Sequence, residues 1–148
     1  MFISEVKENK KCYMDLLLIA DESENMINRY LERGKMYLLD DNGIKNICIV
    51  TNEGNDVLEI KNIVTVPKCQ NQGYGKKMIK FIEDKYRNKF KILQVGTGDS
   101  LSVISFYERC GFRKSHKVKN FFVDNYEKPI YEQGIRLIDM IYLTKNLK

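Results

Sequence analysis

Histidine and proline are scarce in this chain of 148 residues, which contains one of the former and two of the latter. The four cysteines are widely separated, and neither they nor the lone His116 show the spacing of a metal-ligand set. We therefore expect no metal centre. A disulfide framework is not expected either, because a chain of this length can bury a sufficient core without covalent crosslinks.

Long apolar runs are absent as well. The longest apolar cluster, Met14–Ala20, is interrupted by Asp15 and is much shorter than the roughly 20 residues that cross a bilayer. Met1–Lys11 contains acidic residues and lacks the apolar segment of a secretory signal. We expect a cytoplasmic protein with no membrane association, and the absence of linkers or repeats predicts one domain over residues 1–148.

The formal net charge is +5, but the basic residues are spread along the whole chain with acidic residues between them. No recognised nucleic-acid motif and no arginine-rich run is present, so we expect no nucleic-acid partner. The excess of positive charge fits a protein that holds a ligand with several phosphate groups.

The most informative segment is Gln70–Lys77, with the sequence QNQGYGKK. The β-branched run before it, Ile60–Val66, ends at Pro67 and predicts a strand. The residues after it repeat their apolar side chains at helical spacing. Lys76 and Lys77 then fall in the first helical turn, where the helix dipole disfavours a cation by about 0.3–1 kcal/mol. An anion bound to the free N–H groups of the helix start would account for both lysines.

Two common phosphate-binding fingerprints do not fit this segment. A dinucleotide fingerprint has a third glycine where Met78 stands, and a P-loop has Ser or Thr where Lys77 stands. The pattern Gln-x-x-Gly-x-Gly after a strand instead resembles the acyl-CoA pyrophosphate loop of the GNAT superfamily of N-acetyltransferases. Taken alone, the hexapeptide also fits a glycine turn before a solvated basic helix start.

A second segment carries the same resemblance. Residues 100–112, SLSVISFYERCGF, predict a short helix that ends at Gly111 and begins at a capping Ser100 or the aspartate before it. The GNAT pattern ends in Tyr-Glu-x-x-Gly-Phe, which Tyr107–Phe112 matches. The chain departs from the pattern at Ser100, where the family often has Asn, and at Val103, where Ala is common. With both motifs in the family's order, the chain is identified as a member of the GNAT superfamily over essentially its whole length.

The resemblance implies the GNAT fold, an α/β (mixed α+β) architecture in which helices flank a single splayed mixed β-sheet and acyl-CoA enters the wedge. The residue patterns predict strands over residues 2–6, 36–40, 44–51, 57–66, 91–97, 112–123 and 135–145. They predict helices over residues 11–20 and 23–33, from the glycine loop to about residue 88, and around Tyr107. The last strand has apolar residues on both faces, which indicates an internal position.

The resemblance also implies the activity, which is transfer of an acetyl group from the co-substrate acetyl-CoA directly to a primary amine. No nucleophile–histidine pair stands in the motifs, which argues against a covalent enzyme intermediate. By resemblance, the main chain of Ile63, Val64 and Thr65 binds the pantetheine arm, and Ser100 keeps a hydroxyl for it. The residues expected around the pyrophosphate are Gln70, Asn71, Gln72, Gly73, Tyr74, Gly75 and Lys76.

Two residues are candidates for acid–base catalysis. Tyr107 is the candidate general acid, because a phenol of pKa about 10 can protonate a desolvated thiolate, whose thiol has a pKa of about 8.5. Its alternative role is packing with Phe106 against the sheet. Glu59 is the candidate base, and the alternative is a solvated glutamate that pairs with Lys61. Strict alternation places Glu59 on one face with Lys61 and Ile63, unless a bulge intervenes.

The expected acceptor is a small cationic amine, which acidic residues near the acceptor side would attract. The acidic residues considered are Glu59, Asp124, Glu127 and Glu132. A protein or peptide amine is the alternative acceptor, and a non-catalytic acyl-CoA-binding regulatory module or a nucleotide-binding module is the alternative function. The aromatic segment 121–131 fits an amine-binding wall, a subunit contact in a homodimer, or a loop with ordinary packing.

Overall fold

A computed structural model describes residues 1–148, and a seven-stranded sheet with strand order β1-β2-β3-β4-β5-β9-β6 organises them. The strands of this sheet are β1 (Phe2–Val6), β2 (Lys35–Asp40), β3 (Ile44–Asn52), β4 (Val57–Thr65), β5 (Ile92–Thr97), β6 (Arg113–Val118) and β9 (Met140–Asn146). A separate hairpin consists of β7 (Tyr131–Glu132) and β8 (Ile135–Arg136). The helices are α1 (Met14–Ala20), α2 (Glu24–Asn28), α3 (Tyr74–Tyr86), α4 (Leu101–Arg109) and α5 (Phe121–Asn125), with short 3-10 turns η1 (Lys10–Tyr13) and η2 (Pro67–Cys69).

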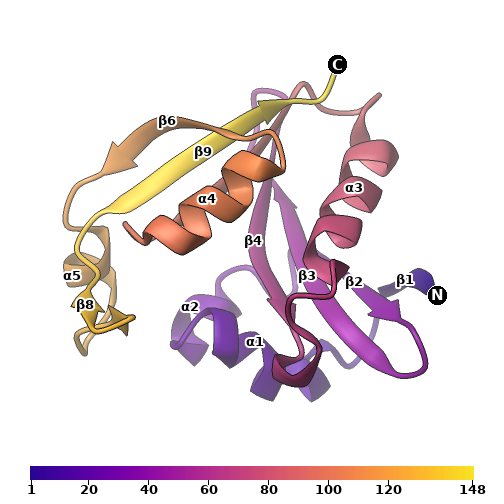
Figure 1. Ribbon diagram of the computed structural model, residues 1–148, viewed down its shortest axis with the longest axis horizontal. Helices are drawn as coiled ribbons and strands as arrows, with labels where there is room; N and C mark the ends of the chain where they lie inside the picture. The colour runs from indigo at the N-terminus through magenta and orange to yellow at the C-terminus, as the bar shows by residue number, and fades with distance from the viewer.

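The sheet splays at its only parallel pair, β4 and β5. These strands pair from Val57 opposite Ile92 to Ile60 opposite Val95, and their pairing ends there. Beyond Ile60, β4 pairs only with β3, and beyond Val95, β5 pairs only with β9. Figure 1 shows β9 and β6 running away from β4, with α4 lying in the angle between them. The splayed mixed sheet predicted from the resemblance is therefore confirmed.

Helices cover both faces of the sheet, and each face has its own hydrophobic core. The larger core lies under α3 and α4 and includes Leu58, Ile60 and Val95, and the smaller one lies under α1 and α2 and includes Val64. The register of β4 against β3 shifts between Ile60 and Asn62, which marks a β-bulge at Lys61. Because of this bulge, Ile60 and Ile63 both pack against the larger core although they are three residues apart.

A buried amide fastens the N-terminal helices to β4. Asn62 donates from Nδ2 to the main-chain oxygen of Leu17 at 3.1 Å and to the Tyr30 hydroxyl at 3.2 Å. Lys10 is 7% exposed, and its Nζ donates to the carbonyl oxygen of Gly34 at 2.7 Å, beyond the end of α2. These bonds hold the end of α1 beside the wedge between β4 and β5.

The C-terminal third differs from the sequence prediction. The strand predicted over residues 112–123 ends at Val118, because Asn120 adopts a φ of 58° and residues 121–125 form α5. The strand predicted over residues 135–145 is interrupted, since Ile135–Arg136 pairs with β7 and β9 begins only at Met140. Short apolar runs fit a strand and a buried helix equally well, which explains the first error. The second arises because Ile135 and Arg136 pair with β7 in a separate hairpin instead of continuing into β9. The internal position predicted for the last strand is confirmed, because β9 lies between β5 and β6.

The helices predicted before β2 are also shorter than expected. The first begins as the 3-10 turn η1 before α1, and the second, α2, ends at Asn28 and continues as turns to Arg33. Ser23 caps α2, accepting a hydrogen bond from the main chain of Met26 at 3.2 Å. No helix of the chain combines the length and the apolar composition that crossing a bilayer requires.

The contact between Gly98 and Leu137 anchors the segment that joins the β7–β8 hairpin to β9. A Cβ atom at Gly98 would lie 2.6 Å from both Cδ atoms of Leu137, so we expect Gly98→Ala to lower the free energy of unfolding by about 1–3 kcal/mol. The same change should cost much less in a Leu137→Ala background, where the space is free. Urea unfolding of the four proteins in this double-mutant cycle measures the coupling, and equal costs in both backgrounds would contradict the contact.

Candidate active site

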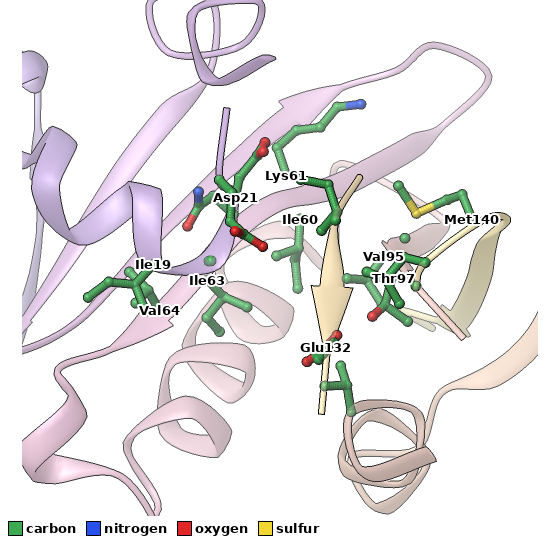
Figure 2. A pocket seen from close by; sticks show the side chains of 18 of the residues that line it. Ile19, Asp21, Ile60, Lys61, Ile63, Val64, Val95, Thr97, Glu132 and Met140 are labelled. Atoms are coloured by element: carbon green, nitrogen blue, oxygen red, sulfur yellow. The ribbon is translucent and has the colours of Figure 1, made fainter. Parts of the chain in front are cut away.

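A cavity of about 410 Å³ occupies the wedge between β4 and β5. Its walls come from β4, β5, the end of α1, one side of α4, α5, and β7 with its flanking residues Ile130 and Leu137. Figure 2 shows Ile63 of β4 on one side, Val95 and Thr97 of β5 on the other, and Glu132 of β7 between them. The termination of the β4–β5 pairing therefore creates a site in the middle of the sheet.

The part of β4 that lines the cavity has no strand partner on its open edge. Ile63, Val64 and Thr65 all line the cavity, and this stretch pairs only with β3. The side chain of Val64 is buried in the core under α1, and the Thr65 hydroxyl accepts a hydrogen bond from Asn46 at 2.9 Å. A ligand in the wedge would therefore meet mainly the main chain of this stretch, and its predicted contact with pantetheine stays a prediction.

The glycine loop leads from the cavity to the start of α3. Gln70 lines the cavity, and Gly73 is the N-cap of α3 with a φ of 86°. No side chain caps this helix, so the N–H groups of its first turn are left for a ligand. Lys76 and Lys77 extend from the same turn and take part in no ion pair. The helix start is thus an uncompensated positive end that suits an anion.

Two residues of the loop have structural contacts of their own. Tyr74 is 8% exposed, and its hydroxyl donates to Asp41 Oδ2 at 2.8 Å, so only its main chain is open to a ligand. A Cβ atom at Gly75 would lie 3.2 Å from the ring of Phe106 in α4. Glycine at this position therefore lets α3 and α4 approach each other, apart from any contact with phosphate. The side chains of Asn71 and Gln72 are exposed.

Tyr107 lies in α4 and lines the cavity with a side chain that is 6% exposed. Its ring packs edge-on against Phe106 and Phe112, with centroids 5.3 and 5.6 Å away, but its hydroxyl makes no hydrogen bond within the protein. Burial raises the pKa of the Tyr107 phenol, and the nearby acidic groups Cys48, Cys110 and Glu132 raise it further. The phenol is therefore protonated at neutral pH, and the raised pKa makes it a weaker proton donor than a free phenol.

Ser100 begins α4 as its N-cap residue, but its side chain accepts no hydrogen bond from the helix. The hydroxyl is 3.4 Å from that of Ser102, and the residue is 7% exposed. Ser100 does not line the cavity. Its predicted contact with pantetheine stays a prediction.

Glu59 does not line the cavity that contains Tyr107. Its carboxylate accepts a hydrogen bond from Gln94 Nε2 at 2.7 Å and forms an ion pair with Lys61 Nζ at 2.9 Å. The residue is 5% exposed and lines an adjoining cavity of about 210 Å³. The bulge at Lys61 turns Ile63 to the opposite face, so Glu59 and Ile63 do not share a face as strict alternation predicts. The structure therefore brings Tyr107, but not Glu59, to the main cavity.

Sequence reasoning did not identify Asp21, which lines both cavities at the end of α1. Its carboxylate accepts hydrogen bonds from the Tyr30 hydroxyl at 3.0 Å and the Tyr126 hydroxyl at 2.8 Å. Burial and the charge of Asp21 raise the pKa of both phenols. Tyr126 is distant in sequence, so no local pattern could have revealed this contact.

Of the acidic residues predicted to gather near the acceptor, only Glu132 lines the main cavity. Asp124 and Glu127 are exposed and line neither cavity. The aromatic segment 121–131 contributes Phe122, Tyr126 and Tyr131 to the cavity wall. The predicted role of these rings as an amine-binding wall stays a prediction.

Comparison with known proteins identifies relatives of this chain. Residues 32–114 match a family model described as an acetyltransferase (GNAT) domain. The uncharacterized N-acetyltransferase YvbK of Bacillus subtilis (strain 168) is 32% identical over 136 residues, which is 90% of this chain and 88% of that protein. A GNAT family acetyltransferase from Elizabethkingia anophelis, solved with acetyl-CoA bound, has a TM-score of 0.92 and 39% identity, and the match covers 98% of this chain and 97% of that one.

A third relative is an IAA acetyltransferase from Bacillus cereus ATCC 14579, with a TM-score of 0.88 and 31% identity over 98% of this chain and 99% of that one. This chain belongs to the GNAT family of acetyltransferases, which confirms the family predicted from its two motifs. It is an N-acetyltransferase whose co-substrate is acetyl-CoA.

Gly73 allows a test of the predicted pyrophosphate loop, because Gly54 provides a matched control. Both glycines have a left-handed φ, 86° and 83°, and a Cβ atom at either would meet no heavy atom within 4 Å. We expect Gly73→Val and Gly54→Val to lower stability to a similar extent, by at least about 1–2 kcal/mol. Only Gly73→Val should weaken acetyl-CoA binding, by about tenfold or more, because its side chain stands beside the bound phosphates.

Isothermal titration of both variants with acetyl-CoA measures this difference. Equal dissociation constants for the two variants would show that the pyrophosphate binds elsewhere.

Proposed function

We propose that this acetyltransferase moves the acetyl group of acetyl-CoA directly to the primary amine of a small cationic molecule. The observation that carries the proposal is the cavity of about 410 Å³ in the wedge. It is lined both by the phenol of Tyr107, which makes no hydrogen bond within the protein, and by the carboxylate of Glu132. One wall suits a thioester and its leaving thiolate, and the other suits an amine.

In this proposal the start of α3 and the glycine loop bind the pyrophosphate of acetyl-CoA. The free N–H groups after Gly73 and the ammonium of Lys76 meet the phosphate charges there. The main chain of Ile63, Val64 and Thr65 then accompanies the pantetheine arm from the loop to the cavity. Gln70 stands at the junction, since it belongs to the loop and lines the cavity.

The chemistry requires a proton for the departing thiolate. Tyr107 is the general acid of the proposal, because its side chain lines the cavity and its hydroxyl has no partner within the protein. The amine attacks the thioester carbonyl directly, since neither cysteine nor histidine lines the cavity as a nucleophile for an acetyl-enzyme.

The charges around the cavity favour a cationic acceptor. Asp21, Glu22 and Glu132 line it, whereas the one cationic residue in its wall, Lys61, is already paired with Glu59. The β7–β8 hairpin closes one side of the cavity, which leaves more room for a small amine than for a folded protein surface.

Tyr107→Phe tests the general acid. We expect turnover to fall by a factor of about 10²–10⁴, or less if solvent water protonates the thiolate, while the dissociation constant of acetyl-CoA stays within a few-fold. Stability should change little, because the hydroxyl makes no hydrogen bond within the protein. Tyr13→Phe, which alters a tyrosine outside both cavities, serves as the control. Steady-state thiol release gives the turnover, and an unchanged rate for Tyr107→Phe would remove Tyr107 from the acid role.

The acceptor class is measured by thiol release from acetyl-CoA with polyamines, aminoglycosides, amino acids and peptide N-termini. We expect the small polycationic amines to give the highest kcat/KM, and we expect that value to fall as salt screens the charges. A preference for neutral amines or peptides would contradict the proposed acceptor. Acetyl-CoA binding without turnover on any amine would favour a regulatory module, and stronger thermal stabilisation by ATP or NAD would favour a nucleotide-binding module.

A further inference from the structure

The three carboxylates that line the main cavity differ in their exposure and in their hydrogen-bond partners within the protein. Asp21 accepts hydrogen bonds from two tyrosine hydroxyls and from the main chain of Ser23. Glu22 is exposed on the loop between α1 and α2. Glu132 is half-buried, and it forms no hydrogen bond from its side chain and no ion pair. Glu132 is therefore the one partly buried carboxylate of the cavity that has no partner within the protein.

A second group in the same cavity lacks a partner. The hydroxyl of Tyr107, in a side chain that is 6% exposed, makes no hydrogen bond within the protein. Burial and the nearby Glu22 raise the pKa of Glu132, and the charge of Glu132 in turn raises the pKa of Tyr107. A hydroxyl and a half-buried carboxylate that line the same cavity and have no partners within the protein are both available to a ligand bound there.

The hairpin that carries Glu132 has several contacts that fix it. Glu132 pairs with Ile135 across the hairpin, and Gln133 and Gly134 both have positive φ, as a tight two-residue turn requires. Gln133 Nε2 donates to the Ser102 hydroxyl of α4 at 3.1 Å. The main chain of Leu137 donates to Ile130 at 2.8 Å. Glu132 is therefore held against α4, the helix that presents Tyr107.

We propose that Glu132, rather than Glu59, binds the ammonium group of the acceptor and removes its first proton. This role rests on the proposed function. Glu59 is unsuited to it, because its carboxylate is already bonded to Lys61 and Gln94 outside the main cavity. A carboxylate without a partner can form the charge-assisted hydrogen bond that an alkylammonium ion seeks.

The proton transfers of this proposal balance. The acceptor R–NH3⁺ gives one proton to the Glu132 carboxylate, which later returns it to solvent. The free amine forms the new N–C bond to the acetyl carbon, and the C–S bond breaks. The departing thiolate takes the proton of the Tyr107 hydroxyl, and the second proton lost by the nitrogen restores that hydroxyl. The products are the amide, the free thiol of coenzyme A and one proton released to solvent.

Glu132→Gln tests this role with little change in size, and Glu127→Gln is the matched control, because Glu127 is exposed and lines neither cavity. We expect Glu132→Gln to lower kcat/KM for a polyamine by about 10²-fold or more. The loss should be smaller for an amine that is already neutral at the assay pH. Acetyl-CoA affinity should be unchanged in both variants, and Glu127→Gln should match the wild type throughout.

Wild-type kcat/KM in Glu132→Gln would overturn the inference and leave the proposed function standing. If the wild type acetylates no amine, the proposed function fails. Titration of spermidine into the protein loaded with coenzyme A then tests whether Glu132 binds an ammonium group. Loss of spermidine binding in Glu132→Gln would support Glu132 as the ammonium site, and equal binding would overturn it.

Discussion

The architecture depends on two parallel strands that pair for part of their length and then separate. Beyond Ile60 and Val95, β4 keeps a row of main-chain groups with no partner on one edge. Buried main-chain groups without partners are costly, so a wedge of this kind is stable only where water or a ligand can satisfy them. The cavity, the path expected for pantetheine and the position of α4 in the angle of the sheet all follow from this separation.

The bulge at Lys61 changes which face of the sheet the following side chains of β4 point to. Upstream of it, Glu59 joins an ion pair with Lys61, and this pair stands in the smaller cavity. Downstream of it, Ile63 faces the core under α3 and α4. One extra residue in one strand therefore separates an ionic network from the downstream wall of the main cavity, although both belong to the same nine-residue strand.

Local rules were sufficient to predict the glycine loop, the helix after it and the helix of Tyr107. A proline after a β-branched run, a glycine turn and a helical repeat of apolar residues each depend on neighbours within a few positions. The same rules failed between Asn120 and Met140, where short apolar runs fit a strand or a helix. They also could not assign Glu59 or Asp21, because the partners that occupy these carboxylates come from other elements of the fold.

The bond between Tyr126 and Asp21 joins segments 105 residues apart, near opposite ends of the chain. The expected contacts with acetyl-CoA, by contrast, lie within residues 63–107, in one strand–loop–helix–strand–helix stretch. In the proposed function, the acetyl-CoA contacts come from one continuous stretch of the chain, whereas the acceptor side of the cavity is assembled from segments far apart in sequence. In this proposal, substitutions near either end would alter the acceptor side of the cavity and leave the acetyl-CoA contacts intact, so the choice of amine would diverge independently of the use of the acetyl donor.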